Sequence, residues 1–280
     1  MKILIMPNLS KNNSIECTNE VIDELCFNHI EPCLDIKFKS YFQRSDVIFD
    51  TIDENLQNCD LIIAIGGDGT IIEAAKSAIV FDKPVLGVNM GRVGYLAQLN
   101  RCDLKMLSRL KTGEYAIEER MILETEIPNC GKKYAVNDIV VSRGILNKVI
   151  DMNISCDDKP MINYRADGVI VSTPTGSTAY SLSAGGSIVD PKIECILLTP
   201  ICPHSLASRS LIFSPQRQLS VTTQKYNNLC DVFVSCDGEE PIILENGKPI
   251  TIKKSEKKVK FLRFDDKNFY DIVSEKLMQA

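Results

Sequence analysis

A glycine-rich turn with a carboxylate inside it, Gly66-Gly67-Asp68-Gly69-Thr70, could perform phosphate chemistry. The turn follows the apolar run 61–65, which is typical of a buried strand, and it precedes 71–76, which indicates the start of a helix. Backbone amides in such a turn can approach a phosphate closely, because glycine has no side chain in the way. The negative charge of the Asp68 side chain would repel a bound phosphate, so its presence in this turn indicates a separate chemical role. Asp68 could hold a metal ion on the phosphate, or take a proton from a hydroxyl that attacks the phosphate.

A second segment, 167–186, gathers hydroxyl side chains at the end of another apolar run. Pro174 and Gly176 shape a turn there, and we expect a helix to start after Pro174. Hydroxyl groups and the amides of a helix N-terminus suit ribose oxygens and phosphates, and Tyr180 could stack on a base. The alternative is a turn rich in serine and threonine that only caps a helix. The hydroxyl residues of the turn are Ser172, Thr173, Thr175, Ser177 and Thr178.

A polar pair, Asn137 and Asp138, interrupts the apolar run 134–142, which we interpret as one strand. A buried amide beside a carboxylate is costly without partners, and a bound ribose or an adenine amino group would supply them. The alternative is a bulge or strand end at which both side chains face water.

Several classes of function are disfavoured by the sequence. It contains no P-loop motif and no Gly-x-Gly-x-x-Gly after the first strand. The chain has 11 cysteines, with no Cys-x-x-Cys pair, and 2 histidines, so a zinc site or a disulfide framework is not expected. For His204 we favour a structural imidazole. The net charge of −5 gives no sign of a nucleic-acid or membrane partner, no apolar run reaches membrane-spanning length, and the cysteine usage favours a reducing cytoplasm.

The elements that must position these residues change in character along the 280 residues. Strand and helix patterns alternate in the first part, which predicts a doubly wound α/β domain with a parallel sheet over 1–113. Its last helix is expected over 103–110, with Asp103 near the N-cap. Short strands separated by turn residues follow, which predicts an all-β sandwich over 114–255. We interpret 253–258 as a solvated turn, and the closing segment 256–280, with a helical pattern over 271–278, is expected to return to the first domain.

The glycine-rich turn resembles the loop shared by NAD kinases, diacylglycerol and sphingosine kinases and, more loosely, phosphofructokinases. The segment 167–186 closely resembles the long signature of NAD kinases and narrows the choice. Residues 90–96 resemble their Gly-x-Leu-Gly-Phe turn, 136–138 their Asn-Glu/Asp pair, and 235–238 their late Val-Asp-Gly turn. The resemblance covers nearly the whole chain and identifies it as a member of the NAD kinase family of bacterial type.

This resemblance implies transfer of the γ-phosphoryl group of ATP, or of another triphosphate or polyphosphate, to the 2′-hydroxyl of the adenosine ribose of NAD. Asp68 would accept the proton of that hydroxyl, and the phosphate loop would consist of Gly66, Gly67, Gly69 and Thr70. A divalent cation, expected to be Mg²⁺, would accompany the nucleotide, and a homodimer or homotetramer is implied, in which a neighbouring subunit often completes the NAD site. The residues that would bind NAD are Asp68, Gly69, Asn137, Asp138, Lys148, Arg165, Asp167, Thr175, Thr178, Ala179, Tyr180, Ser181, Leu182, Ser183 and Asp237.

Two positions depart from the family pattern. Glu73 stands where many relatives carry a basic or small residue, which puts a phosphate contact there in doubt, and Arg92 replaces a common histidine. Two other functions stay open at this point. One is a lipid or sugar kinase that shares the glycine loop, and the other is a dinucleotide-binding protein without turnover.

Overall fold

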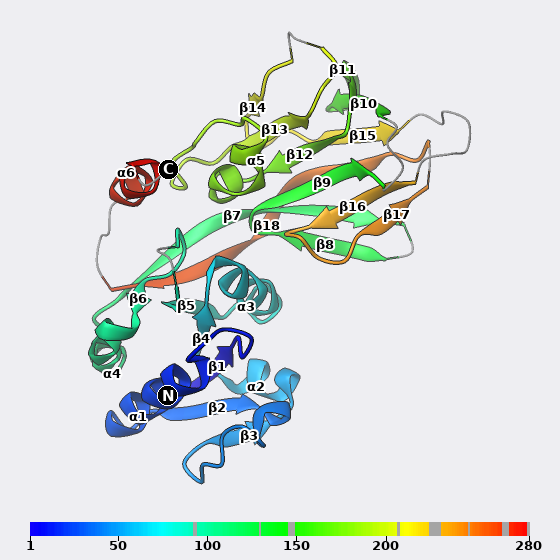
Figure 1. The fold of residues 1–280 in the computed structure, drawn as a ribbon. Coiled ribbons are helices and arrows are strands. Elements are labelled where there is room, and N and C mark those ends of the chain that lie inside the picture. The colour runs from blue at the N-terminus through cyan, green and yellow to red at the C-terminus, as the bar shows by residue number, and fades with distance from the viewer. Residues whose placement is uncertain are drawn as a thin grey trace. The chain divides into compact units, whose positions relative to one another are not determined.

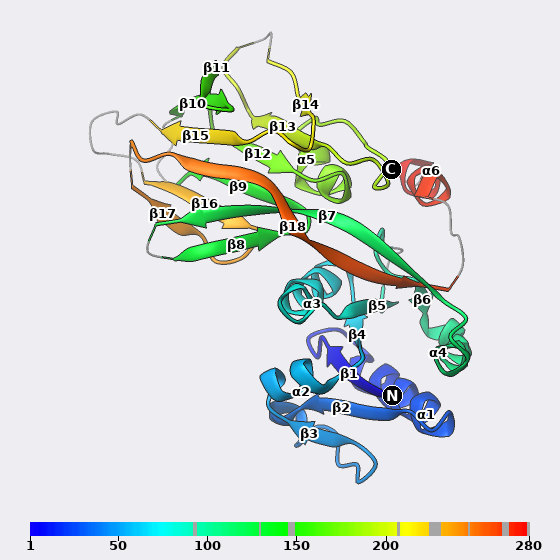
Figure 2. The same ribbon diagram turned by 180° about the vertical axis from the view of Figure 1, so that it is seen from behind.

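The structure is a computed structural model that describes residues 1–91, 94–128, 130–144, 149–205, 208–223, 231–245, 247–264 and 269–278. The chain divides into unit 1, formed by Met1–Glu119 with Val259–Ala280, and unit 2, formed by Arg120–Lys258 (Figures 1 and 2). It passes from one unit to the other inside two long strands, β7 (Ala116–Ile127) and β18 (Ile250–Arg263). Among the described helices, none has the length and apolar character needed to cross a membrane.

Unit 1 is built on a parallel sheet in the order β5-β4-β1-β2-β3, and the end of β18 pairs with β5. The chain winds outward from β1 through β2 and β3, then continues on the other side of β1 as β4 and β5. This reversal beside β1 makes the sheet doubly wound and confirms the predicted fold class of the first part. The strands are β1 (Lys2–Pro7), β2 (Glu31–Asp35), β3 (Ile48–Asp50), β4 (Leu61–Gly66), β5 (Pro84–Asn89) and β6 (Leu99–Asn100).

Helices cover both faces of this sheet and enclose one apolar core. In both views α1 and α4 lie on one face, while α2 and α3 lie on the other (Figures 1 and 2). Asp103 lies near the N-cap, as expected, and accepts a hydrogen bond of 3.1 Å from the N–H of the capping residue Asn100, but the helical turn begins at Arg101, two residues before the predicted start. The helical segments are α1 (Ser14–Phe27), η1 (Ile36–Phe38), α2 (Ile52–Asn58), α3 (Asp68–Phe81), η2 (Arg101–Ser108), α4 (Arg109–Thr112) and α6 (Phe269–Met278).

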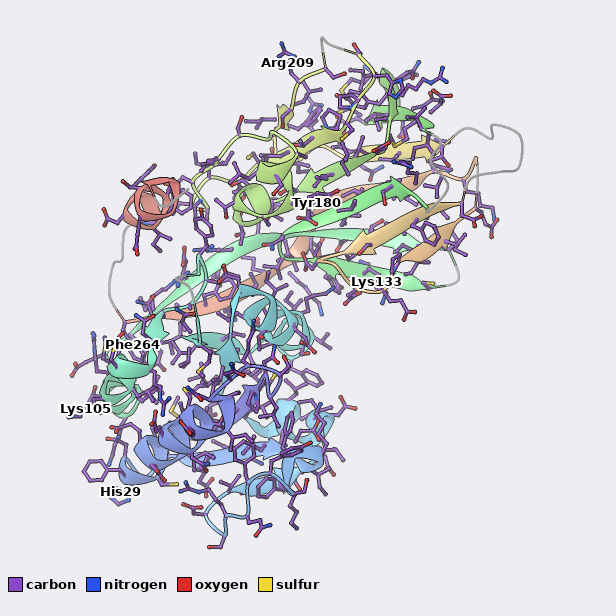
Figure 3. The ribbon with its side chains drawn as sticks, viewed as in Figure 1. His29, Lys105, Lys133, Tyr180, Arg209 and Phe264 are labelled. Carbon is purple, nitrogen blue, oxygen red and sulfur yellow. The ribbon has the colours of Figure 1, made fainter. Side chains whose placement is uncertain are left out.

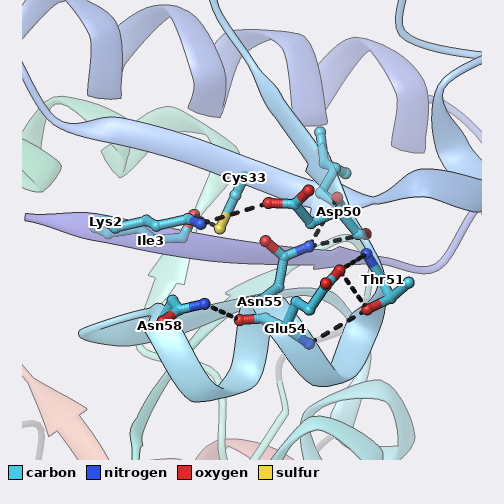
Figure 4. A network of polar contacts seen from close by, with 9 residues as sticks. Lys2, Ile3, Cys33, Asp50, Thr51, Glu54, Asn55 and Asn58 are labelled. Carbon is cyan, nitrogen blue, oxygen red and sulfur yellow. Dashed lines mark hydrogen bonds and ion pairs between the residues drawn. The ribbon is translucent and has the colours of Figure 1, made fainter.

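The short helix α2 is fixed to the carboxyl ends of two strands (Figure 4). Thr51 and Glu54 form a reciprocal cap at its start, in which each side chain accepts a hydrogen bond from the backbone N–H of the other. The fully buried Asn55 donates from its amide nitrogen to the carbonyls of Leu34 at 3.0 Å and Asp50 at 3.1 Å. These contacts hold the edge of the sheet at which β2 ends.

Unit 2 is a pair of antiparallel sheets, as expected for the second part. One sheet has the order β11-β10-β15-β18 with β7 and β8, and the other has the order β14-β13-β12-β9-β16-β17. Alternate residues of both sheets, such as Met152 and Val171, meet in one apolar core. The remaining elements are β8 (Gly131–Ala135), β9 (Asp138–Arg143), β10 (Ile150–Cys156), β11 (Lys159–Ala166), β12 (Gly168–Ser172), η3 (Thr175–Thr178), α5 (Tyr180–Ser183), β13 (Ile196–Ile201), β14 (Leu211–Phe213), β15 (Leu219–Thr223), β16 (Val232–Cys236) and β17 (Ile242–Leu244).

Three local predictions in this unit were wrong. The expected strand 134–142 is broken at Val136 and Asn137 into β8 and β9, which belong to different sheets. The helix after Pro174 is two short turns, η3 and α5, because the backbone at Ala179 (φ −99°, ψ −128°) leaves the helical region. The segment 253–258 is not a turn but part of β18, where the buried Ser255 donates to a carboxylate oxygen of Glu124 at 2.8 Å.

Candidate active site

The glycine-rich turn lies where the winding of the unit 1 sheet reverses. It follows β4, and Asn8 follows the neighbouring strand β1. The N–H of Asn8 donates to the carbonyl of Ile65 at 2.9 Å, and its side-chain amide donates to the hydroxyl of Thr70 at 3.0 Å. In open α/β sheets, ligands bind outside the carboxyl ends of the strands at such a reversal. The topology therefore indicates a ligand site at 66–70, the same segment that the sequence indicates by its glycines and its carboxylate.

The turn itself has the predicted strand-turn-helix form. β4 ends at Gly66, Gly67 precedes the helix, and Asp68 is the first residue of α3. A Cβ atom built on Gly67 or Gly69 would meet no other atom within 4 Å, so the backbone is open on that side. A helix N-terminus with accessible amides attracts anions, as a phosphate loop requires.

The carboxylate of Asp68 is held by the segment that follows β5. The N–H of Tyr95 donates to Oδ2 at 2.9 Å, and the N–H of Leu96 donates to Oδ1 at 3.2 Å. Burial and the nearby charge of Asp68 raise the pKa of the Tyr95 hydroxyl. Asp68 is thus fixed in orientation by two backbone donors, and each of its oxygens still has a lone pair for a further proton or hydrogen bond.

Arg263 supports this arrangement from the end of β18. Its Nη1 donates to the carbonyl of Leu96 at 3.1 Å, and its Nε pairs with Glu118 at 2.7 Å. The sequence analysis missed Arg263, because it stands 167 residues from Leu96 with no local motif. It positions the backbone that holds Asp68.

A backbone corner in unit 2 presents Asn137 and Asp138, and Asp237 holds it. The N–H groups of Val136 and Asn137 each donate to the Asp237 carboxylate at 2.7 Å, and that of Asp138 donates at 3.1 Å. The backbone of Asp237 returns a bond of 2.9 Å to the carbonyl of Asp138. The carboxylate of Asp237 therefore orients the corner by accepting hydrogen bonds from the corner's backbone N–H groups.

The hydroxyl-rich segment closes the same corner from the other side. Thr173 donates from its N–H to the carbonyl of Asn137 at 2.8 Å and from its hydroxyl to that of Val136 at 2.6 Å. A Cβ at Gly176 would lie 2.2 Å from the carbonyl oxygen of Asn137, so no larger residue fits there without a backbone shift. Thr173 was not among the predicted site residues, although it lies inside the predicted segment.

The predicted contact residues of this segment differ in accessibility. Tyr180 starts α5 (Figure 3), with its side chain 46% exposed. Ser183 is exposed as well. Thr178, Ala179 and Leu182 are partly exposed, so they too are accessible to a ligand. Two others are engaged inside the protein. The buried Ser181 hydroxyl lies 2.9 Å from that of Thr199, and the buried Thr175 hydroxyl lies 3.5 Å from Arg120.

Arg165 and Asp167 form a second group at the other end of the β9–β12 pair. Arg143 binds the carboxylate of Asp167 through two nitrogens, at 2.7 and 3.2 Å, and Arg165 is exposed on β11. Gly168 pairs with Ser142, whereas Ser172 pairs with Asp138. The five residues of β12, 168–172, lie between Asp167 and Thr173, so these two residues are about 20 Å apart along the extended chain. The structure thus places the predicted NAD residues of unit 2 in two groups.

Two further expectations concern Lys148 and the metal ion. Lys148 lies outside the described residues. Within the described residues no cluster of three or more His, Cys, Asp or Glu side chains could hold a metal. These described residues therefore form no preformed metal site of this kind.

Asp138 is 5% exposed, and burial, followed by the charge of Asp237, raises the pKa of its carboxyl to about 7. The folded protein then binds a proton that the unfolded chain releases above pH 4, so this residue's contribution to stability falls as pH rises from about 4 to about 7. We expect the free energy of unfolding of the wild type, relative to Asp138→Asn, to decrease over this window by up to about 4 kcal/mol. Urea unfolding at several pH values measures it, with the exposed Asp158→Asn as control. A difference that stays constant from pH 4 to 8 would contradict the assignment.

Family models match both parts of the chain. The ATP-NAD kinase N-terminal domain matches residues 3–115, and the ATP-NAD kinase C-terminal domain matches residues 136–264. The NAD kinase of Caldanaerobacter subterraneus subsp. tengcongensis is 36% identical over 289 positions, covering 99% of each chain. That of Acetivibrio thermocellus is 37% identical over 284 positions, covering 99% of this chain and 97% of the relative.

Two solved structures resemble the fold over its full length. A yeast NADH kinase complexed with NADH has a TM-score of 0.88 at 26% identity, covering 99% of this chain and 87% of that one. An NAD kinase from Archaeoglobus fulgidus in complex with ATP has a TM-score of 0.79 at 25% identity and covers both chains completely.

Proposed function

Because this chain belongs to the NAD kinase family, we propose that Asp68 is the base of the phosphoryl transfer that the family performs. The enzyme phosphorylates NAD to NADP with ATP as donor. The lipid or sugar kinase and the binding protein without turnover are not retained, because both parts of the chain match NAD kinase. The observation that carries the role of Asp68 is its position in the open turn at the reversal of the unit 1 sheet.

The step that we propose balances without a further reactant. The adenosine 2′-oxygen of NAD forms a bond to the γ-phosphorus of ATP, the bond from that phosphorus to the β,γ-bridging oxygen breaks, and ADP leaves. The proton of the 2′-hydroxyl goes to the carboxylate of Asp68. The amides of Gly67, Gly69 and Thr70 bind phosphate oxygens, and the two donors from Tyr95 and Leu96 keep the base in one orientation.

Unit 2 supplies the proposed NAD contacts. Asn137 and Asp138 bind ribose or adenine polar groups, and Tyr180 stacks on a base. Asp237 acts through the corner backbone, as its three amide contacts support. Thr175 and Ser181, whose hydroxyls are engaged, serve mainly to shape the segment. The roles of Gly69, Thr178, Ala179, Leu182, Ser183 and Lys148 remain proposals taken from the family pattern.

We further propose a homodimer or homotetramer that works in the cytoplasm. The separation of Arg165 and Asp167 from the Asn137 corner supports a contribution of this second group to the NAD site of a neighbouring subunit. The eleven cysteines favour a reducing compartment. A divalent cation, expected to be Mg²⁺, would be held mainly by the triphosphate and water.

A coupled assay of NADP formation on the purified chain tests the function. With ATP, Mg²⁺ and NAD we expect turnover on the order of 1–100 s⁻¹, as in other phosphoryl transfers. Replacing ATP with a non-transferable analogue provides the control, and NADH is tested beside NAD as acceptor. Turnover that is no faster than in the analogue control would overturn the assignment.

A further inference from the structure

Unit 1 contains a pocket beside the glycine-rich turn to which no ligand has been assigned so far. Its volume is about 240 Å³, and its lining includes Asn8, Asp35, Lys37, Phe38, Thr70 and Glu73. These side chains come from the carboxyl ends of β1 and β2 and from η1 and α3. Thr70 belongs both to the pocket and to the phosphate loop, so a ligand in the pocket would have its phosphates at the loop.

Asp35 is the most deeply buried charged group of this pocket, at 8% exposure. Its Oδ1 accepts a hydrogen bond from the N–H of Lys37 at 3.1 Å, and its Oδ2 lies 3.2 Å from the Lys37 ammonium. Each oxygen keeps a lone pair for another donor. In doubly wound sheets an acidic residue after the second strand suits the vicinal hydroxyls of a ribose, because both can donate to one carboxylate.

The charge and size of the pocket restrict the ligand further. Asp35 and Glu73 provide two carboxylates against one ammonium, so the pocket disfavours a chain of phosphates. Phe38 offers an apolar surface to a base. A volume below the roughly 300–1,000 Å³ of drug-sized sites fits a nucleoside and not a whole dinucleotide.

We propose that this pocket takes the nucleoside of the phosphoryl donor, with Asp35 accepting hydrogen bonds from its ribose hydroxyls. The donor is then a nucleoside triphosphate and not inorganic polyphosphate. The inference rests on the proposed function, because it assigns the donor half of that reaction.

A cycle that removes the hydroxyls from the ligand and the carboxylate from the protein tests this contact. In the wild type we expect 2′,3′-dideoxy-ATP to have a kcat/KM about ten- to a hundredfold below that of ATP. In Asp35→Ala the two donors should agree within about threefold, and the KM for NAD should not change. Asp35→Asn, which keeps the shape, serves if the alanine variant does not fold. Asp50→Asn, at the end of β3 and outside the pocket lining, is the matched control and should keep the full penalty.

Binding gives a readout that does not depend on turnover. With saturating NAD present, calorimetry of ADP and 2′,3′-dideoxy-ADP forms complexes that cannot react, and we expect the same loss of discrimination in Asp35→Ala. A hydroxyl penalty that persists unchanged in Asp35→Ala overturns the proposal, as does tripolyphosphate serving as donor as efficiently as ATP. Absence of NADP with every donor, combined with the expected binding cycle, overturns the proposed function and leaves the pocket assignment standing.

Discussion

Asp68→Asn is expected to lower kcat for NADP formation by about 10²- to 10⁴-fold, the range for loss of a positioned general base. An amide cannot accept the proton of the 2′-hydroxyl at neutral pH, whereas its size matches the carboxylate. NAD binding should change little. Steady-state kinetics together with calorimetric titration of NAD separate the two effects. Turnover like that of the wild type would rule out Asp68 as the base.

Asp68 also accepts two backbone hydrogen bonds, so loss of activity in Asp68→Asn could reflect a displaced segment. Gly94→Ala tests this point. A Cβ at Gly94 would lie 2.1 Å from Oδ1 of Asp68, so it would turn the carboxylate away without changing its chemistry. We expect a large fall in kcat together with a lower melting temperature, because the turned carboxylate loses its hydrogen bonds from Tyr95 and Leu96. If Gly94→Ala keeps full activity, the orientation of the carboxylate is not critical for catalysis.

Asp237→Ala is expected to destabilise the protein by about 2–4 kcal/mol and to weaken NAD binding by tenfold or more. The substitution removes the acceptor of three backbone N–H groups at the corner that presents Asn137 and Asp138. It also removes a negative charge that raises the pKa of Asp138, so that pKa should fall.

Denaturant unfolding, NAD titration and the pH dependence of stability measure the three effects of Asp237→Ala. Asp237→Asn keeps one acceptor oxygen and should give intermediate values. A variant with unchanged unfolding and unchanged NAD affinity would show that the corner does not need Asp237.

The glycine-rich turn was predictable because all of its determinants are adjacent in the sequence. An apolar strand, two consecutive glycines and a helix start within about ten residues allow one local geometry, and the structure has it. The hydroxyl-rich segment was found for the same reason. Its helix was overestimated, because the backbone leaves the helical region at Ala179, and alanine is a strong helix former that gives no local sign of such a break.

The corner itself could not be predicted as a corner. Apolar residues stand on both sides of Asn137 and favour a continuous strand, and the carboxylate that bends the backbone is about 100 residues away. The same holds for Arg263, which acts on Leu96 across most of the chain. Segment 253–258 shows the opposite error, because its lysines indicate a turn, whereas the segment lies inside the long strand β18, which pairs with β7, β15 and β5.

The passage of the chain through β18 has a consequence for synthesis. Unit 2 is one continuous stretch of chain, 120–258, whereas unit 1 needs Lys260 and Phe261 of β18 to pair with β5, which is made about 175 residues earlier. On the ribosome most of unit 1 therefore emerges first but cannot be completed until β18 has been made, and its sheet edge at β5 stays unpaired with β18 until then. Chaperone dependence and aggregation during expression should accordingly originate in unit 1.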